Sequence, residues 1–269
     1  MVNGFSRYGL ALFFFACASF AVAGAAFGAH PLITDDTGTQ GKGKYQVELN
    51  SQIHWDKATS NGIEIRENGG ELAALLSAGV ADTVDVVVGL PWVWSRIREN
   101  GAAVVDGNGP GDMSLEVKWR FFARDGYSLA VKPGVTFPTG DEEKGFGAGR
   151  ATYGLILIAT REWERFFLHV NGGYHRKDFQ LYADREANRR DIWHASVAAG
   201  AEAMKGLKVV ANVGMETNSD KGSNTWPSFI LGGVIYSVTE NLDVDLGVKL
   251  GLNRPESDLA GLAGLAWRF

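Results

Sequence analysis

The chain has 269 residues, with 26 Lys and Arg against 31 Asp and Glu, and therefore a formal net charge of −5 at pH 7. This mild acidity gives no reason to expect nucleic-acid binding. After the amino-terminal segment, no stretch reaches about 18 uncharged apolar residues, which excludes a helical membrane span.

Residues 1–29 have the pattern of a secretory signal peptide. Arg7 is their only charged residue, an apolar stretch follows it, and the segment ends in small residues, so we expect cleavage near Ala25 to Ala29. Cys17, the only cysteine, lies in this segment, and the mature protein would then contain neither a disulfide nor a cysteine nucleophile. An exported protein of this kind enters a membrane only as a closed barrel, because an open sheet leaves backbone groups unpaired in lipid.

After a polar, Gly- and Thr-rich lead-in over residues 30–43, apolar and polar side chains alternate throughout residues 44–269. In the first segment, for example, Val47 and Leu49 alternate with Glu48. Strands of about ten to twelve residues suit a tilted crossing of a bilayer. The twelve predicted strands cover residues 44–55, 71–81, 84–94, 112–123, 127–137, 150–161, 164–175, 191–203, 206–216, 226–237, 241–252 and 258–269.

The connections distinguish a membrane barrel from a soluble one, which has the same alternation. Turns after the even-numbered predicted strands are short, as at Asp82-Thr83, whereas most others are long, as over 56–70, 95–111, 138–149 and 176–190. Short turns on one rim and long loops on the other are typical of outer-membrane barrels, and the short rim would face the periplasm. We therefore predict an all-β fold, a transmembrane antiparallel up-and-down β-barrel of about 12 strands with an amino-terminal signal peptide.

Aromatic side chains support this orientation, because they fall on the face assigned to lipid and near the two predicted rims. Trp55, Trp92 and Trp193 lie towards the long-loop rim. Trp267 and Phe269 lie towards the short-turn rim, at the end of the last predicted strand. We expect these residues to form two aromatic girdles.

Several short sequence blocks are spread over the first two thirds of the mature chain, among them Thr34–Gly41, Gly109–Asp112 and Pro138–Asp141. Together they resemble the outer-membrane barrel family named for the meta-cleavage pathway of phenol degradation. The resemblance implies a bacterial outer-membrane protein that moves aromatic or other hydrophobic compounds. It also implies that Phe269, with Trp267, is read as an assembly signal by the barrel-assembly machinery.

The polar residues on the predicted inner face are candidates for lining a narrow lumen. Opposed charges there could select which solutes pass. Alternatively, Glu116, Lys118, Arg120 and Lys132 could pair with one another and fill a closed lumen. The lumen-lining candidates are Glu48, Glu71, Asp85, Glu116, Lys118, Arg120, Lys132, His169, His194, Glu202, Lys208, Glu216, Asp243, Asp245 and Lys249.

Part of the presumed lumen is apolar, which would suit a hydrophobic or aromatic solute better than an ion. The predicted strands 150–161 and 226–237 are apolar on both faces, however, and a register error of one residue would turn this wall towards lipid. The apolar candidates for the inner face are Ile156, Ile158, Phe167, Phe229, Leu231 and Ile235.

We find no catalytic constellation. A lipase would need Ser and His together on the outer wall, and the five histidines are scattered singly rather than at metal-ligand spacing. We therefore predict no catalytic residue, no metal and no cofactor, and a channel or transporter for passive passage of a small solute that is aromatic or hydrophobic. The alternatives are a barrel enzyme that acts on lipid and a sealed structural barrel.

The expected partners follow from this location. They are outer-membrane lipid and lipopolysaccharide, the barrel-assembly machinery, and the small-molecule solute. Arg185, Arg189 and Arg190 could meet lipopolysaccharide phosphates, although a solvated loop is the simpler interpretation. Whether residues 30–43 plug the lumen is open at this stage.

Overall fold

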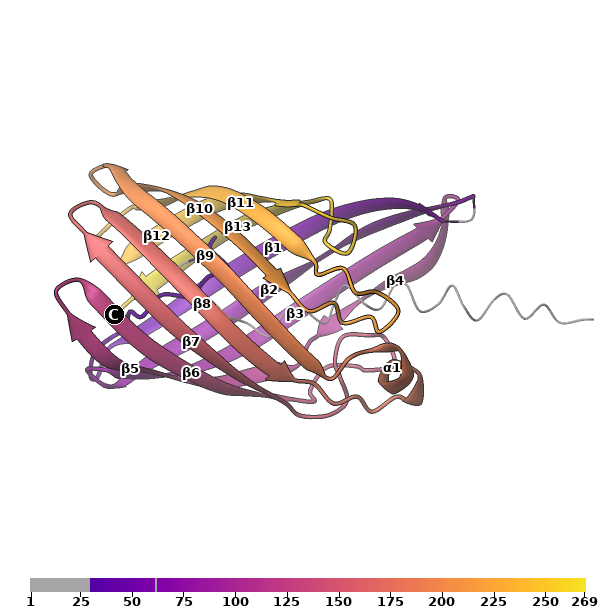
Figure 1. The fold of residues 1–269 in the computed structure, drawn as a ribbon, viewed down its shortest axis with the longest axis horizontal. Coiled ribbons are helices and arrows are strands. Elements are labelled where there is room, and N and C mark those ends of the chain that lie inside the picture. The colour runs from indigo at the N-terminus through magenta and orange to yellow at the C-terminus, as the bar shows by residue number, and fades with distance from the viewer. Residues whose placement is uncertain (1–29, 61) are drawn as a thin grey trace, which may run out of the picture.

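The computed structural model describes residues 30–60 and 62–269, so the predicted signal peptide lies outside the described residues. The described chain forms antiparallel strands and one short helix, α1 (Tyr182–Ala187), arranged as a barrel (Figure 1). The strands are β1 (Tyr45–Ser60), β2 (Ile63–Ala81), β3 (Val84–Glu99), β4 (Ala102–Pro110), β5 (Met113–Arg124), β6 (Tyr127–Phe137), β7 (Thr152–Trp163), β8 (Phe166–Arg176), β9 (Asp191–Met204), β10 (Leu207–Glu216), β11 (Ser228–Ser237), β12 (Leu242–Gly251) and β13 (Leu259–Arg268).

The barrel is closed by the first and last strands, and its wall has twelve strand positions. β1 pairs with β13 from Gln46 opposite Arg268 to Trp55 opposite Leu259. β3 pairs with β5 near the short-turn rim and with β4 further along, so that β4 and β5 occupy one position in succession. The predicted twelve-stranded up-and-down barrel is thereby confirmed.

Two of the predicted long loops are wrong, because most of residues 56–70 and 95–111 continues as paired strands. These hairpins project beyond the barrel at the long-loop rim (Figure 1). These strands were predicted as loops because many of their side chains are polar. A hairpin in water can carry polar side chains, however, because they form cross-strand ion pairs such as Arg96 with Asp106 at 2.9 Å. Asn100-Gly101 at one tip has positive φ at both residues, 46° and 87°, and this dipeptide was the local indication of a hairpin turn.

The exterior of the barrel is apolar and the interior is polar, the reverse of a water-soluble barrel. Trp119 is 50 % exposed, whereas the preceding Lys118 is only 9 % exposed. Likewise Leu246 is 62 % exposed beside the buried Asp245. This arrangement is stable where lipid, rather than water, contacts the outer surface. The exposed aromatic residues include Tyr45, Trp55, Trp92, Trp119, Phe121, Tyr153, Trp193, Trp226, Tyr236, Trp267 and Phe269.

The two strands that are apolar on both faces are β7 and β11, and their burial settles which face points inward. Ile156 and Ile158 of β7 are buried while the intervening Leu157 is exposed. In β11, Leu231 is buried and Ile230 is exposed. The apolar wall therefore faces the lumen.

Phe269 packs against the start of β1 at the short-turn rim. The Tyr45 backbone N–H donates to the Phe269 carbonyl oxygen at 2.9 Å, and the Phe269 N–H donates back at 3.0 Å. The Phe269 ring lies 5.8 Å from the Tyr45 ring and 5.0 Å from the Trp267 ring, centroid to centroid. The three rings form one cluster across the seam between β13 and β1.

We expect Phe269→Ala to lower the amount of folded barrel in the outer membrane, because it removes ring contacts at the closing seam and the aromatic group proposed as an assembly signal. The measurement is the heat-modifiable band of outer-membrane fractions on a gel. Tyr236→Ala is the matched control, because Tyr236 is another exposed rim aromatic. Equal folded levels for the Phe269 variant and the wild type would contradict this role.

Candidate functional site in the barrel lumen

Most of residues 30–43 lies inside the barrel, and we call residues 30–43 the luminal segment. Thr34 and Asp35 are fully buried, and Asn212 of β10 holds the backbone next to them. The Asn212 Oδ1 accepts from the N–H groups of Ile33 and Thr34 at 2.8 and 3.0 Å. The Asn212 Nδ2 donates to the Thr34 Oγ1 at 2.7 Å. One side chain of the wall thus satisfies three polar groups of the segment.

On the other side of the lumen, the luminal segment is bound by charge. The Asp35 carboxylate lies 2.7 Å from the Lys118 Nζ of β5 and 2.7 Å from the Lys132 Nζ of β6. Lys132 also lies 3.3 Å from the Glu116 carboxylate. Because Asp35 and both lysines are largely removed from solvent, each charge depends on the others.

Asp36, next to this cluster, is 3.9 Å from the Lys118 Nζ. Burial alone would raise the pKa of the Asp36 carboxyl, but the nearby charge of Lys118 and the hydrogen bond from the Gly38 N–H help to hold the pKa below its ordinary value. Asp36 therefore remains ionised at neutral pH, and the luminal segment carries negative charge.

The apolar wall packs against the luminal segment. Leu32 is buried in one cluster with Val210, Phe229 and Leu231, and Ile33 packs against the same cluster. The inward-facing apolar residues of β10 and β11 are therefore covered, in part, by the protein's own chain. This explains why they are apolar although they face the lumen.

The remainder of the luminal segment is tied to the short-turn rim. The Gln40 N–H donates to the Asp85 carboxylate at 3.0 Å, and the Lys42 N–H donates to the Asp82 carboxylate at 3.1 Å. Gly79 permits the closest approach: a Cβ there would lie 1.9 Å from the Gly41 carbonyl oxygen. The segment is therefore anchored at both ends and in the middle.

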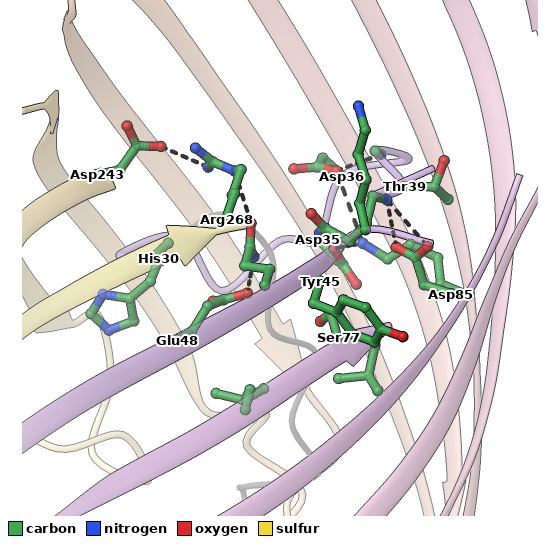
Figure 2. Close-up of a pocket in the computed structure, with 18 of the residues that line it drawn as sticks. His30, Asp35, Asp36, Thr39, Tyr45, Glu48, Ser77, Asp85, Asp243 and Arg268 are labelled. Atoms are coloured by element: carbon green, nitrogen blue, oxygen red, sulfur yellow. Dashed lines mark hydrogen bonds and ion pairs between the residues drawn. The ribbon is translucent and has the colours of Figure 1, made fainter. Parts of the chain in front are cut away.

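A cavity of about 550 Å³ lies beside the luminal segment, on the side of the short-turn rim (Figure 2). Its lining carries charges of both signs, most of them already paired, as in the Arg268–Asp243 contact at 2.6 Å. Glu48 accepts from the side-chain amides of Gln46 and Asn50. A cavity of this size and mixed lining has room for water or for a small solute that carries a polar group.

The predicted lumen-lining residues differ in exposure. Glu202 and Lys208 are exposed at the ends of the short β9–β10 turn rather than enclosed. Glu71, Arg120, His194, Glu216 and Asp243 are half-buried. The buried members are Glu48, Asp85, Glu116, Lys118, Lys132, His169, Asp245 and Lys249.

Sequence reasoning missed Asp35, the residue that joins the charged walls, because the polar composition of residues 30–43 resembles an ordinary lead-in. The only indication was the resemblance of its Thr34–Gly41 block to a family pattern.

In the described part of the chain, no helix is long and apolar enough to span a membrane. Residues 30–60 and 62–269 contain no group of three His, Cys, Asp or Glu side chains placed to hold a metal ion.

The sequence matches the family model described as "Putative MetA-pathway of phenol degradation" over residues 34–269. The chain belongs to this family. The match begins at Thr34, so it includes most of the luminal segment as well as the whole barrel. No curated protein matches the sequence.

Solved structures show the same architecture. The COG4313 outer membrane channel from Pseudomonas putida F1 has 15 % identity, covers 87 % of this chain and 98 % of its own, and superposes with a TM-score of 0.68. The NanC porin has 9 % identity over 82 % and 98 %, with a TM-score of 0.54. The translocator domain of autotransporter NalP from Neisseria meningitidis has 13 % identity over 87 % and 91 %, with a TM-score of 0.54. At these identities the likeness shows the fold, which barrels of different function share.

Two of the sequence blocks that carry the resemblance, Gly109–Asp112 and Pro138–Asp141, meet at the long-loop rim of this phenol-degradation family member. The Asp112 carboxylate accepts from the N–H groups of Gly140 and Ala148, both at 2.9 Å. The Thr139 Oγ1 accepts from the Met113 N–H at 2.8 Å and donates to the Gly111 carbonyl oxygen at 3.0 Å. The loop over residues 138–149 is thereby fixed to the junction of β4 and β5.

The arginine-rich loop of this family member is also ordered by internal contacts. The Arg189 guanidinium donates to the carbonyl oxygens of Asn218 at 2.9 Å and Ser223 at 2.7 Å, and to the Asn224 Oδ1 at 2.9 Å. Arg190 lies 3.3 Å from the Asp178 carboxylate. Arg189 thus holds the loop over 217–227 in place, which the sequence did not indicate.

Proposed function

We propose that this phenol-degradation family member is an outer-membrane channel through which a small aromatic or hydrophobic solute passes by passive diffusion. The observation that carries the proposal is the sidedness of the barrel: exposed Trp119 and Leu246 outside, and buried Lys118 and Asp245 inside. A closed wall of this kind isolates a polar interior from lipid. The cavity of about 550 Å³ beside the luminal segment provides room for a small solute within that interior.

Two features support an aromatic or hydrophobic cargo. The family description refers to phenol degradation. The inner wall combines the charged residues of β5 and β6 with inward-facing apolar side chains on β7, such as Ile156 and Ile158. A solute with a ring and one polar group would match this combination of charged and apolar side chains.

We infer further that the protein is not an enzyme. A lipid-cleaving barrel needs its Ser–His pair on the outer wall, where the lipid is. His54 and His169 are buried inside the barrel, and His30 contacts the buried Asp245.

Outer-membrane lipid, lipopolysaccharide and the barrel-assembly machinery are the partners that such a barrel would meet, and Arg185 and Arg190 remain candidates for lipopolysaccharide contacts.

Conductance in planar bilayers tests the channel. We expect the purified protein to give discrete current steps, and liposomes that contain it to swell in sodium benzoate, an aromatic anion that crosses bare lipid slowly at neutral pH. Liposomes without protein are the control. An absence of both current and swelling, for the wild type and for variants that lack the luminal segment, would favour the sealed barrel that the buried segment otherwise allows.

A further inference from the structure

Several rings on the inner wall lie directly against a glycine of the neighbouring strand. A Cβ on Gly173 of β8 would lie 2.3 Å from the ring of His194 on β9. A Cβ on Gly154 of β7 would lie 2.5 Å from the ring of His175 on β8. Since a Cβ at any of these positions would collide with the ring, the glycines are what lets the rings lie this close to the wall.

Phe229 of β11 follows the same rule, because a Cβ on Gly214 of β10 would lie 2.7 Å from its ring. The His175 and His194 rings are stacked, with centroids 6.2 Å apart and an interplanar angle of 25°. All three rings lie near the long-loop ends of their strands, within the sector from β8 to β11. They form a wall of aromatic rings on one side of the lumen.

Two polar atoms in this wall have no hydrogen-bond partner among the described residues. They are the Oγ of Ser196, which is 4 % exposed, and the Nε2 of His194. The two residues face inward from the same strand, two positions apart. A buried hydroxyl or ring nitrogen without a partner is destabilising unless a ligand or water supplies one.

The luminal segment closes this wall on the side of the short-turn rim, because Leu32 and Phe229 belong to one buried cluster. On the neighbouring strand, the Lys249 Nζ lies 5.6 Å from the Phe229 ring centroid and 2.8 Å from the Glu256 carboxylate. The wall thus has aromatic rings and unpaired polar atoms, and the apolar cluster of Leu32 and Phe229 bounds it on the side of the short-turn rim.

We propose that His175, His194, Ser196 and Phe229 form a binding site for one planar ring that bears a hydrogen-bonding substituent. The ring would stack on the imidazole and phenyl faces, and a hydroxyl group would pair with the His194 Nε2 or the Ser196 Oγ. This site deepens the proposed channel function, on which it rests, by naming where the solute pauses. A saturated ring of the same size lacks the flat π-face that the wall selects.

The test compares phenol with cyclohexanol, which has the same polar group on a saturated ring. Calorimetric titrations use the full-length protein in detergent, with protein-free micelles subtracted. We expect phenol to bind several-fold more tightly than cyclohexanol. Gly173→Ala, which tips the His194 ring off the wall, should weaken phenol binding about fivefold, the scale of one aromatic stacking contact.

Gly172→Ala is the matched control, because a Cβ on this outward-facing glycine of the same strand meets nothing within 4 Å. It should leave phenol binding unchanged. His194→Ala removes the ring without crowding the wall, and it serves if Gly173→Ala does not give the heat-modifiable folded band. Equal affinities for phenol and cyclohexanol, or equal binding by His194→Ala and the wild type, would overturn the site.

The failure of this site can be told apart from the failure of the channel. A wild-type protein that conducts and takes up benzoate, but binds phenol and cyclohexanol alike, keeps the channel and loses the site. A wild-type protein that binds phenol selectively but gives no current, even without its luminal segment, keeps the site and loses the channel.

Discussion

Deleting residues 32–41 should raise the single-channel conductance several-fold. The deletion removes Leu32, which packs against the apolar wall, and Asp35, which pairs with Lys118 and Lys132 on the opposite side of the lumen. It also leaves Lys118 and Lys132 without their main counter-charge, so the ionic selectivity should shift towards anions. Current steps and reversal potentials in planar bilayers under a salt gradient measure both effects.

Two controls separate the loss of the segment from general damage. A Gly-Ser linker of equal length in place of residues 32–41 keeps the chain but removes its contacts, and should also raise the conductance. Lys42→Ala should not, because Lys42 is exposed and its hydrogen bond to Asp82 is made by the backbone N–H, which the substitution keeps. Wild-type conductance in the deletion variant would show that the segment does not obstruct the ion path.

Lys132→Met should lower the free energy of unfolding by about 3 kcal/mol, the usual scale for breaking a buried ion pair. Lys132 is 2 % exposed and contacts both Asp35 and Glu116, so its loss leaves two carboxylates with less compensation. Urea titrations in lipid vesicles, followed by tryptophan fluorescence, give the free energy by linear extrapolation.

A double-mutant cycle shows whether the effect belongs to the pair. The double variant Asp35→Asn/Lys132→Met should lose less free energy of unfolding than the two single variants lose in sum. Each single change leaves a buried charge without its partner, whereas the double change removes both charges. Lys144→Met breaks an exposed pair with Asp141 and should cost at most about 1 kcal/mol. Additive costs for the Asp35 and Lys132 changes would mean that the two groups stabilise the barrel independently.

Much of the fold could be read from local pattern. A strand that separates lipid from a polar lumen must alternate with period two. The alternation of Val117, Lys118 and Trp119 therefore predicts which side chains face lipid and which face the lumen, without any tertiary information. The short turns and the aromatic rims follow from the same membrane geometry. The Asn100-Gly101 dipeptide also indicated a turn at the tip of the β3–β4 hairpin, although the polar residues around it led to a loop prediction.

The sequence by itself therefore determined the barrel, its strand count and the sidedness of its wall, because these depend on neighbours along the chain. Only the tertiary structure decided the inward face of β7 and β11, where Ile156 and Leu157 are equally apolar. It alone also placed Asp35 against Lys118 and Lys132, residues some eighty to a hundred positions away. Such contacts leave no periodicity, because closure of the barrel brings together side chains that local alternation treats as independent.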